Sequence, residues 1–240
     1  MASGKKGRGI MFIAALCAGA LILSEKDFSF EHILSNVAEL KEEKLAGISI
    51  KETDDLLILV NRWHPLDSDF VPELTALSDG TQVDKRCVQE LMTMLEDCNN
   101  AGFSPYICSA YRTIAKQQEL YDNKVQRLIN DGWPEHLAQE RAATEVSRPG
   151  TSEHHLGLAF DIIDSGYTVL DEDQENTPTQ RWLMDNSWKY GFILRYPEGK
   201  SEITGIIYEP WHYRYVGREA AAAIHRSGLC FEEYLESIGK

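Results

Sequence analysis

The chain has 240 residues, a formal net charge of −14 and 43% hydrophobic residues, so its length fits one large domain or two small ones. Apolar segments recur along the chain and 10% of its residues are aromatic, which excludes a fully disordered protein. Only one apolar stretch approaches the length of a membrane span, which excludes a polytopic membrane protein. The acidic balance argues against a nucleic-acid-binding protein, because such proteins usually present a basic face.

The N-terminal segment has the pattern of an export signal. Lys5, Lys6 and Arg8 precede an apolar run from Ile10 to Leu23, and a basic flank before such a run is typical of signal peptides and signal anchors. The run is shorter than the about 17–25 residues that a spanning helix needs. A retained anchor is preferred, while a cleaved signal and a buried core helix stay open. Three parts are therefore expected: a signal or membrane anchor at residues 1–23, a charge-rich stalk at 24–53, and a functional domain at 54–240.

Apolar periodicity and turn residues predict the elements of that domain in chain order. The run Leu56–Val60 suits a buried strand that ends before Asn61 and Pro65. Further expected elements are helices at about 84–99, 114–130, 134–146, 179–190 and 218–226, strands at 106–108, 158–163 and 192–196, and a hairpin or bent strand at 206–216. Helices outside a small, mostly antiparallel sheet give an α+β fold.

Five cysteines are present, and four of them follow the N-terminal segment: Cys87, Cys98, Cys108 and Cys230. An even number is compatible with disulfides outside the cell. Three of the four lie in or beside apolar patterns, however, so free thiols are at least as good an interpretation. No C-x-x-C pair occurs, which gives no support to a zinc ribbon or a thioredoxin-like site.

Three polar clusters lie where predicted strands meet loops, positions at which active sites are commonly held. They span Ser109–Thr113, Ser152–Asp161 and Glu209–Tyr215. Four of the seven histidines lie in the stalk, in a loop or on polar helix faces and are set aside: His32, His64, His136 and His225. The clusters hold the other three histidines, namely His154, His155 and His212.

Two imidazoles and a carboxylate such as Asp161 make a reasonable zinc site with one position open for water. Bound zinc lowers the pKa of that water to about 7, and a second carboxylate such as Glu209 can pass the water's proton to a leaving amine. Each residue also has an ordinary structural interpretation, since a lone histidine can be satisfied in the core, Asp161 can cap a turn and Arg112 can pair with a surface acid. The presence of all three clusters in one chain favours a metal site.

These motifs resemble those of the VanY-type D-alanyl-D-alanine carboxypeptidases, which are zinc peptidases related to VanX and, more distantly, to lysostaphin-like enzymes. The signature S-x-H-x-x-G-x-A-x-D is matched by Ser152, His154, Gly157, Ala159 and Asp161. The signature E-x-W-H is matched by Glu209, Trp211 and His212, and an upstream element of the family is matched by Tyr111, Arg112, Gln117 and Leu120. The stretch Tyr190–Pro197 is also typical of the family. The resemblance covers roughly residues 56–220, with the motifs in the family's order.

The resemblance implies an α+β zinc D-Ala-D-Ala peptidase-like domain that binds one Zn²⁺ per chain. His154, Asp161 and His212 would be the metal ligands, and Glu209 would be the general base that activates the metal-bound water. In a regular strand Glu209 and His212 would face opposite sides. Pro210 favours a bend, however, which would bring both side chains to the metal.

The resemblance also implies residues that contact the substrate. Arg112 would bind the substrate's C-terminal carboxylate or polarise the scissile carbonyl, since its paired N–H donors suit either task. Ser152, Tyr111 and either Gln118 or Gln117 would be lesser substrate contacts. His155 occupies a variable position of the motif and is expected not to be a ligand.

The predicted function is zinc-dependent D,D-carboxypeptidase activity that removes the terminal D-Ala from peptidoglycan stem peptides or their precursors, without a covalent intermediate. The protein would be an exported monomer, anchored to the membrane and facing the cell wall, or secreted if the signal is cleaved. Two alternatives stay open: an L,D-carboxypeptidase acting on tetrapeptide stems, and a non-catalytic wall-binding module. Retention of Glu209 beside all three ligands favours the enzyme. A serine hydrolase and a thermolysin-like peptidase lack their motifs, G-x-S-x-G and H-E-x-x-H.

Overall fold

The computed structural model describes residues 56–240. The expected signal or anchor and the expected stalk lie outside the described residues. Within residues 56–240, no helix combines the length and the apolar character that crossing a membrane requires.

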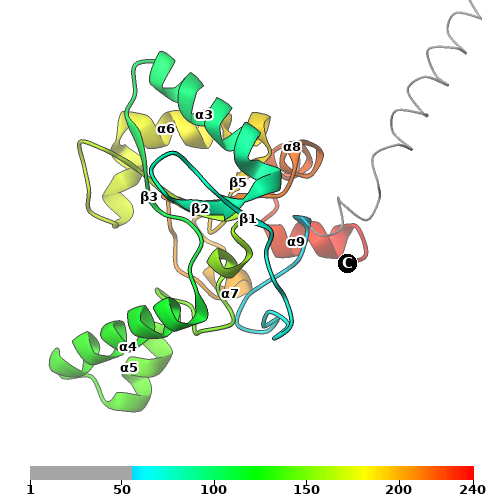
Figure 1. Cartoon of the computed structure of the whole chain (residues 1–240). Helices are drawn as coiled ribbons and strands as arrows, with labels where there is room; N and C mark the ends of the chain where they lie inside the picture. Colours follow the sequence, from blue (N-terminus) through cyan, green and yellow to red (C-terminus); the bar gives the residue numbers. More distant parts are fainter. Residues whose placement is uncertain (1–55) are drawn as a thin grey trace, which may run out of the picture. The chain divides into compact units, whose positions relative to one another are not determined.

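A four-stranded antiparallel sheet forms the middle of the domain, with its strands in the order β3-β4-β6-β5. The strands are β3 (Pro105–Ser109), β4 (Ala159–Asp164), β5 (Phe192–Leu194) and β6 (His212–Tyr215). Two further strands, β1 (Leu74–Ala76) and β2 (Gln82–Asp84), pair with each other in antiparallel fashion. Helices lie outside the larger sheet (Figure 1), which confirms the predicted α+β fold.

The helices fall into groups around this sheet. They are α3 (Val88–Asn100), α4 (Ile114–Asn130), α5 (Glu135–Ala142), α6 (Pro178–Asn186), α7 (Ser201–Thr204), α8 (Arg218–Ser227) and α9 (Phe231–Ser237), with short 3-10 segments that include η2 (Glu153–Leu156). α3 and α6 lie together at the top of Figure 1, whereas α4 and α5 pack against each other at the lower left. α4 and the segment that follows α5 supply one wall of the cavity described below.

Local sequence signals explain where α4 begins and ends. Thr113 is its N-cap, and the Thr113 hydroxyl accepts a hydrogen bond from the N–H of Lys116. Gly132, just beyond the last turn, has a φ of 93°, which only glycine adopts without strain. The cap leaves Arg112 on the short connection between β3 and α4, where its side chain can reach the sheet.

β4 is buried along nearly all of its length because it lies between β3 and β6. Phe160 and Ile162 belong to the main hydrophobic core, together with Leu91 and Met94 of α3. Asp161 points to the opposite side of the strand, since successive side chains alternate. A buried carboxylate is costly unless it is paired, so this position in a central strand marks a functional site.

Two predicted elements are wrong. Leu56–Val60 is not a strand. The Arg214 guanidinium donates hydrogen bonds to the carbonyls of Leu56 and Ile58, at 2.9 and 3.0 Å. These backbone groups therefore need no hydrogen bonds from a neighbouring strand. Residues 206–216 form neither a hairpin nor one bent strand, since only β6 is extended and the chain turns before it. The β1–β2 pair, α7 and α9 were not predicted. Strands of three residues and helices of four and seven residues are too short to show a clear periodicity.

The four cysteines of the described chain are free, which agrees with their interpretation as thiols. Cys87, Cys98 and Cys230 are buried, whereas Cys108 is exposed. Burial raises the pKa of Cys87 and of Cys98 to about 12. Both thiols therefore stay protonated and unreactive at neutral pH.

Candidate metal and catalytic site

The pairing of β4 with β6 brings two of the predicted ligands together. Asp161 and His212 lie directly opposite each other in this antiparallel pair, and opposed residues of adjacent strands have Cβ atoms about 4.5–5.5 Å apart. His154 comes from η2, which leads into β4. Gly157 makes that turn with a φ of 72°, and a Cβ at this position would lie 2.9 Å from the backbone nitrogen of Asp84.

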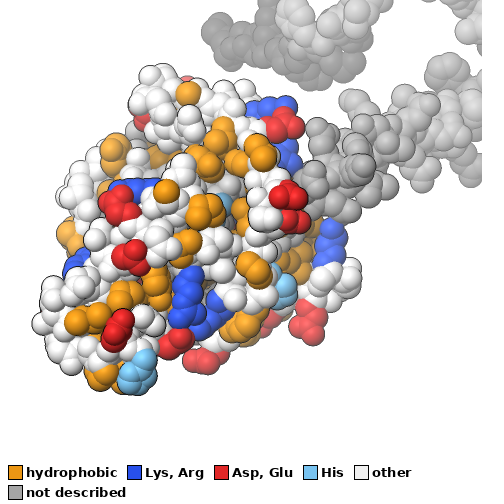
Figure 2. Space-filling model, turned by 60° about the horizontal axis from the view of Figure 1, so that its bottom comes forward, with side chains coloured by type: hydrophobic (Ala, Val, Ile, Leu, Met, Phe, Trp, Pro, Cys, Tyr) orange, Lys and Arg blue, Asp and Glu red, His pale blue; other side chains and the backbone are white. Residues whose placement is uncertain are grey.

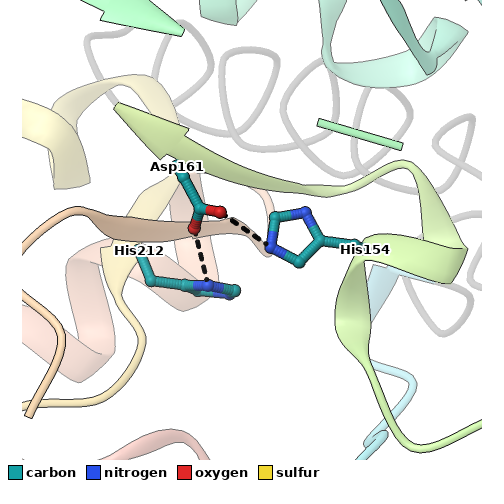
Figure 3. A group of neighbouring side chains, drawn as sticks. All are labelled: His154, Asp161 and His212. Atoms are coloured by element: carbon teal, nitrogen blue, oxygen red, sulfur yellow. Dashed lines mark ion pairs between the residues drawn. The ribbon is translucent and has the colours of Figure 1, made fainter. Parts of the chain in front are cut away.

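The three side chains converge on one point (Figure 3). The carboxylate of Asp161 lies between the two imidazole rings, with Oδ2 3.3 Å from His154 Nε2 and Oδ1 3.1 Å from His212 Nδ1. One ligand atom from each residue lies within 4.8 Å of the others, and all three residues are buried. Ligand atoms around a tetrahedral zinc with bonds of about 2.0–2.1 Å are about 3.3 Å apart, so the spacing fits such an ion.

The hydrogen bonds of His154 decide which of its ring nitrogens can bind a metal. Its Nδ1 lies 2.6 Å from the carbonyl oxygen of Ala110 and therefore carries the proton. Its Nε2 then presents a lone pair toward Asp161. Burial, followed by the nearby charge of Arg112, lowers the pKa of His154 to about 4, so the ring is neutral at pH 7, as a metal ligand must be.

His212 has the opposite arrangement. Its Nδ1 faces Asp161 Oδ1 at 3.1 Å and Glu209 Oε2 at 3.6 Å, while its Nε2 faces Glu153 Oε2 at 3.7 Å. Burial by itself would lower the pKa of His212, but the carboxylates of Asp161 and Glu153 on either side of the ring raise it to about 9. Nδ1 is thus the nitrogen of His212 that lies on the side of the other two ligands.

Arg112 is joined to the ligand carboxylate. Its Nη2 donates to Asp161 Oδ2 at 2.5 Å, and its Nε donates to Ser109 Oγ at 2.8 Å. Burial alone would raise the pKa of Asp161, but His154 and Arg112 lower it well below its usual value. The carboxylate is therefore ionised and can bind a cation.

Glu209 lies beside the three ligands because the chain turns immediately before β6. The N–H of His212 donates to the carbonyl of Glu209 at 3.2 Å, and the two side chains come within 3.6 Å of each other. This turn, which includes Pro210, is the bend that the sequence predicts. Burial raises the pKa of Glu209 to about 8 despite the opposing effect of His212, which makes it the carboxylate of this site that most readily holds a proton.

A cavity of about 380 Å³ opens over the ligands and Glu209. Polar lining residues include Arg112, Gln117, Ser152 and Glu145, and apolar ones include Leu120, Val146, Ile206, Ile207 and Trp211. Figure 2 shows the face that is turned forward from the bottom of Figure 1. Basic and hydrophobic side chains lie next to each other on this face. A cavity of this size and character can hold a short peptide end with a charged group.

The structure separates the two glutamines that were considered as substrate contacts. Gln117 is buried and lines the cavity, where it accepts from Arg112 and donates to the carbonyl of Ser147. Gln118 is exposed and donates to Asp122 on the outer face of α4. Of the two, only Gln117 therefore faces the cavity, because residues adjacent on a helix point about 100° apart.

Three other predicted residues have distinct positions. Ser152 is buried and lines the cavity, whereas Tyr111 is absent from its lining. His155 accepts a hydrogen bond from the N–H of Gly150 at its Nε2 and lies 2.8 Å from the carbonyl of Arg112 at its Nδ1. Both ring nitrogens of His155 are thus occupied, which leaves it no lone pair for a metal.

Two neighbours of His212 were not predicted. Tyr196 packs against the His212 ring with centroids 4.7 Å apart, and the Glu153 carboxylate lies beyond the same ring. The aromatic residue falls in the Tyr190–Pro197 stretch, and Glu153 occupies the variable position of the S-x-H motif. Their roles depend on contacts between distant segments, for which spacing along the chain carries no signal.

Comparisons with known proteins agree with this geometry. The family described as VanY, D-alanyl-D-alanine carboxypeptidase, matches residues 80–218. A D-alanyl-D-alanine carboxypeptidase of Enterococcus faecalis is 43% identical over 206 residues, which are 85% of this chain and 75% of that protein.

Solved structures are similar over most of the domain. VanYB in complex with D-alanine-D-alanine matches with a TM-score of 0.69 and 46% sequence identity. The matched region spans 75% of this chain and 97% of the VanYB chain. A mutant of the D,D-pentapeptidase VanY from the VanB-type resistance cassette, in complex with Zn(II), has the same TM-score with 45% identity, covering 75% of this chain and 99% of its own. The LD-carboxypeptidase LdcB has a TM-score of 0.66 and 34% identity, covering 77% of this chain and 87% of its own.

Proposed function

The chain belongs to the VanY family of D-alanyl-D-alanine carboxypeptidases, and on that premise we propose that it is a zinc-dependent D,D-carboxypeptidase that removes the terminal D-Ala from peptidoglycan stem peptides or their precursors. The observation that carries the proposal is the buried group of His154, Asp161 and His212, which opens into a cavity beside Glu209. Relatives that bind Zn(II) and D-alanine-D-alanine support the choice of metal and of substrate.

Each residue of the site has a distinct task in this reaction. His154 Nε2, His212 Nδ1 and one Asp161 oxygen would hold one zinc ion per chain, which supplies an activated water and polarises the scissile carbonyl. Glu209 takes a proton from the attacking water and gives it to the leaving amine as the C–N bond breaks, so the products are a shortened peptide and free D-Ala. A carboxylate whose pKa is raised toward neutrality by burial suits both transfers.

Arg112 lies at the edge of the ligand group and lines the cavity. Its guanidinium would bind the C-terminal carboxylate of the substrate or the developing oxyanion, because it offers several N–H donors in one plane. Ser152 and Gln117 would add neutral hydrogen bonds to the peptide backbone. A free C-terminal carboxylate is thus a requirement for a good substrate.

The test is a hydrolysis assay on two synthetic stem peptides. The purified chain is incubated with a pentapeptide ending in D-Ala-D-Ala and with the tetrapeptide that ends in a single D-Ala, first with zinc and then with a chelator. Chelator-sensitive release of one D-Ala from the pentapeptide alone is expected. A chain that binds zinc and releases nothing from either peptide would overturn the proposal and favour a wall-binding module.

L,D-carboxypeptidase activity is the second candidate, and the similarity to LdcB favours it. Both reactions need the same metal, base and carboxylate-binding residue, so only the pocket for the residue before the scissile bond distinguishes them. Release of D-Ala from the tetrapeptide alone would assign the chain to this second activity.

We also propose that the protein is exported and anchored in the membrane by residues 1–23, with residues 24–53 as a stalk that presents the domain at 54–240 to the cell wall. The basic flank and apolar run of the N-terminal segment support this arrangement. Membrane fractionation of cells that express the full chain tests it, and recovery of the full-length chain only in the cytoplasmic fraction would contradict it.

A further inference from the structure

A group of four charged residues, three of them buried and one half-buried, lies behind the metal-ligand group. It consists of Glu153, Arg195, Arg214 and Glu232, which we call the ionic cluster. Glu153, Arg195 and Arg214 have no exposed surface at all. Arg195 Nε and Arg214 Nη1 both donate to the same oxygen, Glu153 Oε1, at 2.8 Å each. Arg195 also makes a two-pronged contact with Glu232, at 2.7 and 2.9 Å.

The ionic cluster is balanced in charge but incomplete in hydrogen bonds. Two guanidinium groups face two carboxylates, and both arginine contacts to Glu153 use Oε1, so Oε2 is left over. Two guanidinium donors lie 2.8 Å from the Glu153 carboxylate, so it pairs with them as an anion and its free oxygen can only accept. A buried oxygen without a donor is costly, and the cost is larger when the oxygen belongs to a charged group.

The missing donor lies directly opposite. In the described part of the chain, three buried side-chain atoms lack a hydrogen-bond partner: Glu153 Oε2, His212 Nε2 and Asp161 Oδ1. The first two face each other at 3.7 Å, slightly beyond the usual N–H···O distance of about 2.7–3.2 Å. The third lies on the opposite side of the His212 ring, next to Nδ1.

With a metal ion bound on the ligand side of the ring, this pattern favours one tautomer of His212. A proton on Nε2 would satisfy Glu153 Oε2 and leave the lone pair of Nδ1 directed to the ligand side. A proton on Nδ1 alone would point at Asp161 and Glu209 and leave two acceptors, Nε2 and Glu153 Oε2, facing each other. In a metal-binding histidine, one ring nitrogen commonly donates a hydrogen bond to a neighbouring acceptor. That hydrogen bond fixes the tautomer, so the other nitrogen is free to bind the metal.

We infer that Glu153 is a positioning residue of the metal site, which accepts the Nε2–H of His212 and so holds Nδ1 unprotonated for the metal. This inference rests on the proposed function, because it assigns a role toward the same zinc ion. The ionic cluster holds the carboxylate in place through Arg214, which lies two residues after His212 on the same side of β6. Glu153 also precedes His154 directly, so one residue links the segments of two ligands.

The substitution Glu153→Gln separates this role from charge neutralisation. In this variant the two arginine donors would take the carbonyl oxygen of the new side-chain amide, so its NH₂ group would face His212 Nε2 and require that nitrogen to accept. That arrangement favours the tautomer with a proton on Nδ1, the ligand nitrogen. A wrong histidine tautomer disables a site while leaving its geometry intact.

Glu232→Gln is the matched control. Like Glu153→Gln, this substitution neutralises one carboxylate that is paired with Arg195. Glu153 still faces His212 in this variant. Zinc affinity of both variants and of the parent is measured by competition with a chromophoric chelator. We expect Glu153→Gln to weaken zinc binding by about 10–100-fold, the usual effect of losing such a partner, and Glu232→Gln to have a much smaller effect.

Nitrogen-15 NMR of the His212 ring gives a second measurement that needs no variant. The zinc-loaded parent is expected to carry its ring proton on Nε2, with Nδ1 bound to the metal. A ring proton on Nδ1 would overturn the inference, as would equal zinc affinity of Glu153→Gln and the parent. A parent chain that binds no zinc would overturn the proposed function, and this role of Glu153 with it.

Discussion

Glu209 occupies an environment that differs from that of the other carboxylates that line the cavity. Asp161 is paired with Arg112 and both histidines, and Glu145 is paired with Arg141 at 2.8 Å. Glu209 instead lies 3.6 Å from the His212 ring, and burial raises its pKa. A carboxylate without a strong cationic partner can exchange a proton during catalysis, whereas Asp161, whose pKa is lowered by His154 and Arg112, stays ionised.

Glu209→Gln is therefore expected to reduce kcat by about 10²–10⁴-fold, the usual contribution of a general base. Zinc content and folding should be unchanged, because Glu209 is not one of the three proposed ligands. D-Ala release and zinc content are measured together. Glu145→Gln serves as the control, since it neutralises another carboxylate of the same cavity and should retain most activity. Equal rates for Glu209→Gln and the parent would remove Glu209 from the reaction.

At the scale of the elements, the site depends on the turn between η2 and β4. Gly157 ends η2 in the left-handed conformation, and its N–H bonds to the carbonyl of His154. The β1–β2 pair approaches it so closely that a Cβ would lie 2.8 Å from Leu74 Cδ2 and 2.9 Å from Asp84 N. The glycine of the S-x-H-x-x-G motif is thus required for both its φ angle and its lack of a side chain.

Gly157→Ala should destabilise the domain more than Gly228→Ala does. Gly228 has a nearly equal φ of 68°, but nothing in the described chain lies within 4 Å of its would-be Cβ. Both substitutions carry the left-handed penalty of about 1–2 kcal/mol, and the clash should add about 1–3 kcal/mol for Gly157 alone. Urea unfolding of the two variants measures the difference. Equal losses would show that the backbone contact with β2 imposes no constraint.

The loop before η2 is held by His155, whose ring bridges Gly150 and Arg112. Burial lowers the pKa of His155 below its usual value. As pH falls below about 6.5, the unfolded chain therefore takes up a proton that the folded chain does not. The stability that neutral His155 provides is fully present above this pH and is lost as pH falls toward the lower, folded pKa.

The parent should thus lose more stability between pH 7.5 and pH 5.5 than the variant His155→Gln, which has no group to titrate there. Unfolding free energies of both proteins at the two pH values give the comparison. His154 also has a lowered pKa, but it is present in both proteins and its effect cancels. An equal loss in the two proteins would contradict the assignment of His155 as a neutral bridge.

At the scale of the whole domain, the ligands and the ionic cluster join segments that are far apart in sequence. Arg214 of β6 binds backbone carbonyls at Leu56 and Ile58, and Arg195 binds Glu232 of α9. The metal-ligand group joins η2, β4 and β6 in the same way. An ion that binds only the folded arrangement therefore stabilises contacts across the whole sheet.

Zinc at 100 times its dissociation constant should stabilise the folded chain by about 2.7 kcal/mol. For a domain of about 150–250 residues this corresponds to a rise in Tm of about 5–11 °C. Thermal unfolding with zinc and with a chelator measures the shift. The variant Asp161→Asn, which loses a ligand charge, should show a much smaller shift, and an equal one would mean that zinc binds elsewhere.

The sequence by itself determines the limits of α4, the α+β class and the identity of the candidate ligands. Helix periodicity and caps are local, so α4 begins and ends where its sequence predicts. The polar motifs stand out because His154, Asp161 and Glu209 interrupt apolar segments. These signals lie within short stretches of chain, where the relation between spacing and geometry is direct.

Only the tertiary structure decides which atoms meet. The register of β4 against β6 places Asp161 opposite His212, and the choice between Gln117 and Gln118 follows from which face of α4 turns to the cavity. Leu56–Val60 has the composition of a strand but is held by Arg214, 158 residues after Leu56. The role of Glu153 is not visible in the sequence. Its position next to His212 depends on two arginines, one from β6 and one from the end of β5, which only the fold brings together.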